Sequence, residues 1–325
     1  MASGSPAPPV ITNWAASFSC HPTRYSEPSS AAEVVEVLAR VRAAGGVVRV
    51  AGACHSPNDS VMTGDTIISL ARMSGIHSIA ASSGLVECGG GTTLHTLNAA
   101  LASAGLALPC LGSISDQTVA GAMATGTHGT GVGHGVLSTA LVALELVTGG
   151  GEVLQLSRGG TGSAATAFQA ALCSLGVLGV VTRVTLQAVP AFDLSVQEGP
   201  ATLARILATS PQALAASAPY YRFWWIPHTD RVWEWRAHPV PPAQPAAASG
   251  GLLAGLARTC SAAVAWFWGM AIGYHALQGL LRASQLAPWL LPRINALYAF
   301  LFFRRPKAHT ARSDLAFNFN CLFKQ

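Results

Sequence analysis

The fold is decided by the stretch Val48-Arg49-Val50-Ala51-Gly52-Ala53-Cys54-His55-Ser56-Pro57-Asn58-Asp59. Its first, β-branched residues predict a buried strand. The small residues that follow let the backbone approach an anion closely, and successive N–H groups in such a turn form a nest for phosphate. A simple phosphate loop does not need the imidazole of His55. A strand-to-loop turn with an incidental histidine is therefore the alternative reading.

A second stretch, residues 108–131, consists mostly of small or hydroxyl-bearing side chains, and Asp116 is its only charged residue. So many small residues suit the lining of a large ligand that the backbone touches at many points. Tight packing of Gly/Ala-rich helices is the alternative.

The composition excludes several classes of function. Only 10% of the 325 residues are charged, against about 25% in typical domains, so the surface is sparsely charged or partly faces lipid. The net charge is +5, and the basic residues are scattered until the basic cluster at 304–307. They are not interleaved with aromatic residues as in a nucleic-acid binder. The seven cysteines are widely spaced and contain no C-x-x-C. We expect free thiols in a reducing compartment and no metal site, and residues 1–9 do not look like a secretory signal.

Helical and alternating patterns are mixed along the chain, which predicts an α+β fold. Ser29 or Ser30 is expected to cap a helix over 31–44, with Glu33 in its first turn. Further helices are expected over 94–104 and 164–175. Strands are expected near 47–51, 66–70, 77–80, 85–88, 137–147, 152–156, 176–186, 220–227 and 231–236.

Residues 259–281 carry no charge and are long enough to span a bilayer. The prolines and arginines that follow, and the aromatic residues within, favour an amphipathic segment over 259–303 that lies in a membrane interface. A buried helical part of the second domain and a true span are the alternatives.

With both stretches in view, the sequence resembles the aldonolactone oxidoreductases, which are vanillyl-alcohol-oxidase-type flavoproteins. It looks most like the fungal D-arabinono-1,4-lactone oxidases and less closely like the animal L-gulonolactone oxidases. The matching residues are 52–57, 112–121, 124–131, 178–181, 221–225 and 320–325. The resemblance implies a flexible N-terminus (1–15), a two-subdomain FAD-binding domain (16–190) and an incomplete substrate or cap domain (191–325).

The resemblance also implies the site. FAD would place its pyrophosphate on the turn and would be joined covalently, through its 8α-methyl carbon, to His55. The other implied cofactor-binding residues are Gly52, Ala53, Cys54, Ser56, Pro57, Gly112, Ser113, Ser115, Thr118, Gly121, Thr125, Thr127, His128 and Val180. Cys54 stands where the family usually has glycine, so a positive φ there would cost about 1 kcal/mol.

The implied reaction oxidises an aldono-1,4-lactone at its C2 hydroxyl, reduces O2 to H2O2 and gives an ascorbate-type product. The family's Glu-x-Arg pair would lie beyond Gln325, so we expect a C-terminally shortened chain whose catalytic base is unknown. His128 and His134 are candidates by type only. A dehydrogenase with a protein acceptor, an FAD-binding product without turnover and a membrane-interaction module are alternatives. The fungal likeness implies the mitochondrial outer membrane, and the animal likeness implies the endoplasmic reticulum.

Overall fold

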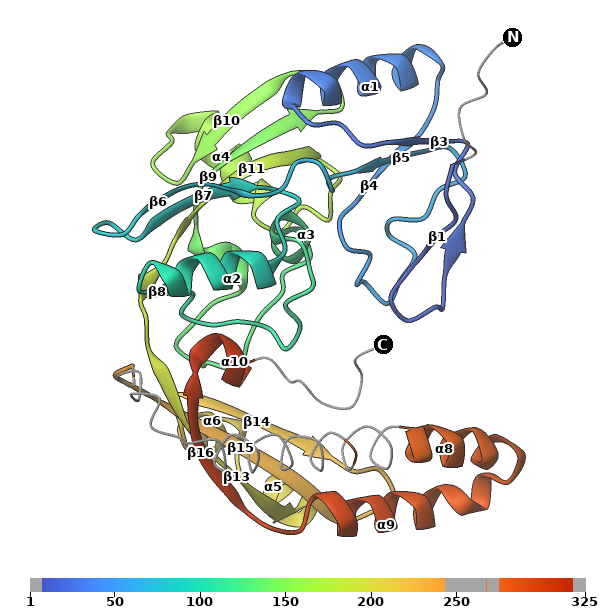
Figure 1. Cartoon of the computed structure of the whole chain (residues 1–325), viewed down its shortest axis with the longest axis vertical. Coiled ribbons are helices and arrows are strands. Elements are labelled where there is room, and N and C mark those ends of the chain that lie inside the picture. The colour runs from blue at the N-terminus through green and yellow to red at the C-terminus, as the bar shows by residue number, and fades with distance from the viewer. Residues whose placement is uncertain (1–7, 243–266, 268–274, 318–325) are drawn as a thin grey trace, which may run out of the picture. The chain divides into compact units, whose positions relative to one another are not determined.

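A computed structural model describes residues 8–242, 267 and 275–317 (Figure 1). The chain divides into two compact units. Unit 1 comprises Met1–Gly129 and His134–Ala191, and unit 2 comprises Thr130–Gly133 and Phe192–Gln325.

Unit 1 begins with a small hairpin and a parallel sheet. Strands β1 (Ile11–Thr12) and β2 (Ser19–Cys20) pair antiparallel, so two residues of the range expected to be flexible form a strand. Strands β3 (Arg24–Ser26), β5 (Thr66–Ser69) and β4 (Val48–Ala51) form a parallel sheet in that order. Helix α1 (Ala31–Ala43) joins β3 to β4, and the Ser30 side chain accepts the Glu33 N–H at its start, as the capping pattern predicts.

The larger sheet of unit 1 is antiparallel, in the order β10-β9-β11-β7-β6. Its strands are β6 (Ile76–Ala80), β7 (Leu85–Gly89), β9 (Leu141–Thr148), β10 (Val153–Ser157) and β11 (Gly179–Gln187). The expected hairpin of residues 137–147 with 152–156 is confirmed as β9 with β10. The expected strand start was wrong, because residues 137–140 form the 3-10 helix η1. The Thr139 hydroxyl donates to the Val136 carbonyl at 2.7 Å, and such local bonds favour a turn over an extended chain.

Helices complete unit 1 and bring the two informative stretches together. They are α2 (Leu94–Ser103), α3 (Val119–Ala124) and α4 (Gly162–Ala171), and the short strands β8 (Leu106–Ala107) and β12 (Val189–Pro190) pair with each other. Ala120 of α3 is buried in one cluster with Val34 of α1, Ile68 of β5 and Val180 of β11. This shared core fixes α3 beside the turn that follows β4.

Unit 2 contains an antiparallel sheet in the order β14-β15-β13-β16. Strand β13 (Asp193–Thr202) is central, and β16 (Lys307–Arg312) adds from late in the sequence. The predicted pairing of the aromatic stretch with the next one is confirmed as β14 (Tyr220–Trp225) with β15 (Arg231–Val240). Helices α5 (Leu203–Ala208), α6 (Pro211–Ala215) and α10 (Ser313–Phe317) accompany the sheet.

The remaining described part of unit 2 is helical. It runs through α8 (Leu277–Leu286), η3 (Pro288–Leu290) and α9 (Leu291–Phe302). Most of the uncharged run 259–281, expected to be interfacial, lies outside the described residues. Among the helices that the structure describes, none is both long and apolar enough to cross a membrane.

Candidate functional site

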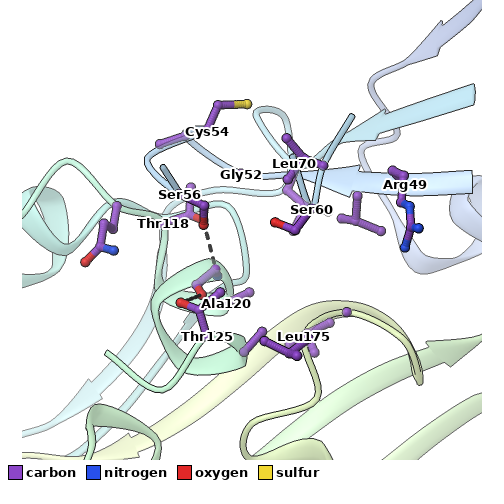
Figure 2. A pocket seen from close by; sticks show the side chains of 18 of the residues that line it. Arg49, Gly52, Cys54, Ser56, Ser60, Leu70, Thr118, Ala120, Thr125 and Leu175 are labelled. Atoms are coloured by element: carbon purple, nitrogen blue, oxygen red, sulfur yellow. Dashed lines mark hydrogen bonds between the residues drawn. The ribbon is translucent and has the colours of Figure 1, made fainter. Parts of the chain in front are cut away.

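One pocket of unit 1 joins the two stretches that the sequence singles out (Figure 2). It holds about 950 Å³ of space between protein atoms, part of it open to solvent. The structure brings together eight of the predicted site residues in its wall: Gly52, Ala53, Cys54, His55, Ser56, Thr118, Gly121 and Thr125. The pocket therefore lies between the turn after β4 and helix α3.

Seven predicted residues are not part of this wall: Pro57, Gly112, Ser113, Ser115, Thr127, His128 and Val180. Gly112 lies against Thr127, since a Cβ there would meet the Thr127 Cγ2 at 2.9 Å. The exposed His128 ring lies 2.9 Å from the Gly129 carbonyl oxygen through Nδ1. Ser115 is buried, and Pro57 and Ser113 are exposed. Val180 is buried in the core, between two residues that do line the pocket.

Gly52 and Thr118 form the junction between the two walls. The Thr118 hydroxyl caps α3 by accepting the Gly121 N–H at 3.3 Å. A Cβ on Gly52 would overlap that same hydroxyl, so only glycine fits at this position without a shift of its neighbour. The small residue is thus required by the approach of the turn to the helix cap.

Cys54 adopts the left-handed conformation, with φ of +52°. Because Cys54 is not glycine, its backbone is strained in this conformation, as the sequence comparison with the family's usual glycine implied. Burial, together with the nearby Cys20 thiol, raises the pKa of Cys54. Its side chain stays a neutral thiol at physiological pH and points away from Thr118 and Thr125 (Figure 2). It places no negative charge where a phosphate would approach.

His55 carries the most informative polar atom of the site. Its Nδ1 is buried and has no hydrogen-bond partner among the described residues. A buried polar atom left unpaired costs about 1–3 kcal/mol. A group that enters the pocket and bonds to the imidazole would remove that cost, so His55 and the glycine-lined wall fit a cofactor held here.

Sequence reasoning missed several wall residues. Arg49 is the only charged side chain in the pocket wall of the described chain, and it interrupts the apolar pattern of β4. That interruption was a usable signal. Gln117 and the loop 174–176 also line the pocket. Leu175 has a positive φ of +52°, and its N–H donates to the Ala124 carbonyl at 2.9 Å, a tertiary contact that no local pattern indicates.

Comparison with known protein families gives two matches that divide the chain. Residues 22–157 match the model of an FAD binding domain, and residues 184–325 match the model of D-arabinono-1,4-lactone oxidase. The pocket wall from Val48 to Thr125 falls within the first match. Unit 1 therefore carries an FAD-binding domain.

Curated relatives cover almost all of the chain. The L-gulonolactone oxidases of Scyliorhinus torazame and Mus musculus are each 37% identical over 96% of it, and the chain spans 67% of each relative. D-arabinono-1,4-lactone oxidase of Saccharomyces cerevisiae is 30% identical over 97% of the chain, which spans 58% of that relative. Both groups that the motifs suggested, the D-arabinono-1,4-lactone oxidases and the L-gulonolactone oxidases, are thus among the relatives.

A solved structure supports the fold. Cholesterol oxidase from B. sterolicum superposes with a TM-score of 0.64 at 18% identity, over 94% of this chain and 60% of that one. At that identity the likeness shows the flavoprotein fold alone. The relatives of 37% identity, of which the chain spans 67%, establish that it belongs to the FAD-dependent aldonolactone oxidase family.

Proposed function

We propose that this chain holds FAD in the pocket beside His55 and oxidises an aldono-1,4-lactone at its C2 hydroxyl, with O2 as the acceptor. The observation that carries the proposal is that one pocket is walled by both the His55 turn and helix α3. The lactone substrate class is supported by the family match and by the names of the relatives. Oxidation removes two electrons and two protons from the substrate, and O2 takes them up as H2O2.

The chain's residues would bind and orient the cofactor, which supplies the redox chemistry when bound. Gly52 keeps the turn close to the α3 cap, so its backbone N–H groups can approach a phosphate. Arg49 provides the positive charge in the wall that attracts a pyrophosphate. The residues with these roles all lie in unit 1.

The proposal includes a covalent bond between the His55 imidazole and the flavin. Its support is the buried, unpartnered Nδ1 in the pocket wall, together with the resemblance of residues 52–57 to the family's flavin-linking segment. A tether of this kind fixes the cofactor's orientation and alters its redox potential.

The test uses the purified full-length chain. After acid denaturation, flavin fluorescence should stay with the polypeptide in the wild type and be lost in His55→Ala. His77→Ala is the matched control, because His77 is exposed on β6 and outside the pocket wall. Flavin released by acid from the wild type would refute the tether and leave FAD binding standing.

Activity is tested separately, with an oxygen electrode and a panel of arabinono-, gulono- and galactono-1,4-lactones. H2O2 production in air with one of them supports the oxidase. Flavin bleaching under argon without O2 consumption in air would assign a dehydrogenase instead. Bound FAD that no lactone bleaches would overturn the proposed turnover.

We also propose that the segment α8–η3–α9 contacts a lipid surface. Leu286 is 93% exposed and Trp289 is 66% exposed, and both lie where the two helices join. The Arg293 guanidinium lies over the Trp289 ring at 5.3 Å. Exposed apolar side chains next to arginines are typical of interfacial helices.

A further inference from the structure

The N-terminal hairpin holds the turn that contains His55. The Trp14 backbone N–H donates to the Cys54 carbonyl at 2.8 Å, and the Asn13 side-chain Nδ2 donates to the Ser56 carbonyl at 3.0 Å. These two bonds reach the residues immediately before and after His55. The hairpin, some forty residues earlier in the chain, thus holds the backbone on both sides of His55.

Asn13 is itself held firmly. It is only 3% exposed, and its Oδ1 accepts the backbone N–H groups of Ser17 at 3.0 Å and Phe18 at 3.1 Å. Its Nδ2 also donates to the Ser17 hydroxyl at 3.1 Å. Because both the oxygen and the nitrogen of its amide are hydrogen-bonded, the side chain is held in one orientation. It therefore couples the hairpin to the turn.

Trp14 also contacts the imidazole directly. The Trp14 and His55 rings are stacked, with centroids 6.3 Å apart and planes 26° apart, within the roughly 4.5–7 Å of favourable ring pairs. Such stacking restricts rotation of the imidazole. The restraint matters because Cys54, next to His55, is held in a strained conformation that would relax if the turn were released.

We propose that Asn13 and Trp14 are positioning residues that orient the His55 imidazole for covalent attachment of FAD. The inference rests on the proposed tether. In that step one imidazole N–H and one C–H of the flavin 8α-methyl group are replaced by an N–C bond. The two protons and two electrons released are taken up by O2, which becomes H2O2.

The test compares three variants of the full-length chain. Trp14→Leu removes the flat ring but keeps apolar bulk, whereas Trp14→Phe keeps an aromatic face. Asn13→Asp keeps the acceptor Oδ1 but loses the donor to Ser56. Each FAD-free protein is mixed with FAD in air, and two quantities are followed: total FAD bound, by quenching of flavin fluorescence, and flavin that survives acid denaturation, over time.

We expect Trp14→Leu and Asn13→Asp to slow tethering on the order of tenfold or more, since small misplacements of reacting groups have effects of this size. Total FAD binding should stay within about twofold of the wild type, and Trp14→Phe should restore most of the tethering rate. Tethering at the wild-type rate in Trp14→Leu would overturn the proposal. Equal loss of FAD binding and tethering, without rescue by phenylalanine, would reduce Trp14 to a structural role.

A flavin-free measurement separates this inference from the tether itself. In the NMR spectrum of the FAD-free wild type, the indole ring current should shift the His55 ring C–H signals, and Trp14→Leu should abolish that shift. A wild type that shows the shift but never tethers would refute both the tether and its positioning, while leaving the stacking geometry intact. A wild type that tethers without the shift would refute the positioning alone.

Discussion

At the scale of single residues, the site combines locally encoded features with contacts that only the folded chain creates. The run of small residues from 51 to 54 predicts a tight turn, and Cys54 does adopt a positive φ. The partner that makes glycine necessary at position 52 is Thr118, which is 66 residues away. Pattern reasoning could place both residues in one site from the family resemblance, but not reveal their direct contact.

Replacing Gly52 by alanine tests this junction. The new methyl group would overlap the Thr118 hydroxyl, and overpacking of this kind costs about 1–3 kcal/mol of unfolding free energy. Thr118→Ala alone should cost about 1 kcal/mol through loss of the α3 cap. The double variant should lose less than the sum of the two, because the clash is relieved when the hydroxyl is gone.

The measurement is urea unfolding of the FAD-free protein followed by circular dichroism. Gly64→Ala is the matched control, since a Cβ there meets nothing within 4 Å. Simple additivity of the two single variants would contradict the proposed junction.

At the scale of elements, periodicity predicts where most helices and strands lie but not what happens at their ends or across their faces. The alternation of residues 231–236 identifies β15 as a strand. It does not reveal that Glu234, a charged residue, is only 5% exposed. Glu234 accepts the Tyr221 hydroxyl and Arg236, each at 2.7 Å, and also pairs with Arg205 of α5. Three partners from three elements satisfy the buried carboxylate, which explains why it is tolerated there.

This network predicts a pH dependence. Burial alone would raise the pKa of Glu234, but the hydrogen bonds from Tyr221 and Arg205 and the charges of Arg236 and Arg205 together lower it below its ordinary value of 4.5. A lowered folded-state pKa means that the stabilisation is complete above about pH 4.5 and is lost as the pH falls through the folded-state value. Glu234→Gln should therefore be less stable at pH 7, by about 1–3 kcal/mol.

The difference between wild type and Glu234→Gln should shrink below about pH 4.5, which urea unfolding between pH 7 and pH 3 measures. Glu36→Gln, an exposed change on α1, is the control. A stability difference that is constant across this range would show that the carboxylate's charge is not what the network stabilises.

At the scale of the whole molecule, one long interval of the sequence lacks acidic residues. Between Glu234 and Asp314 the sequence contains eight Arg and Lys residues and no Asp or Glu. The described part of this interval includes α8 and α9, where Arg282 and Arg293 lie among exposed apolar side chains. What the sequence could not reveal is which apolar residues remain uncovered, because that depends on packing between helices. Ile294 and Ala299, for example, are buried, whereas Leu286 and Trp289 are exposed.

This surface should bind anionic lipid. Each arginine near a negatively charged bilayer contributes about 1 kcal/mol, and the contribution is screened by salt. Vesicles of phosphatidylcholine with phosphatidylserine should therefore sediment the FAD-loaded chain more strongly than phosphatidylcholine alone, and rising salt should weaken the binding. Leu286→Asn should reduce binding to the anionic vesicles about tenfold, since burial of a leucine side chain contributes about 1.5–3 kcal/mol.

Leu207→Asn is the matched control, because Leu207 is 76% exposed on α5, outside the helical segment. Equal loss in both leucine variants, or equal binding to neutral and anionic vesicles, would mean that α8–η3–α9 is not the lipid-contacting surface.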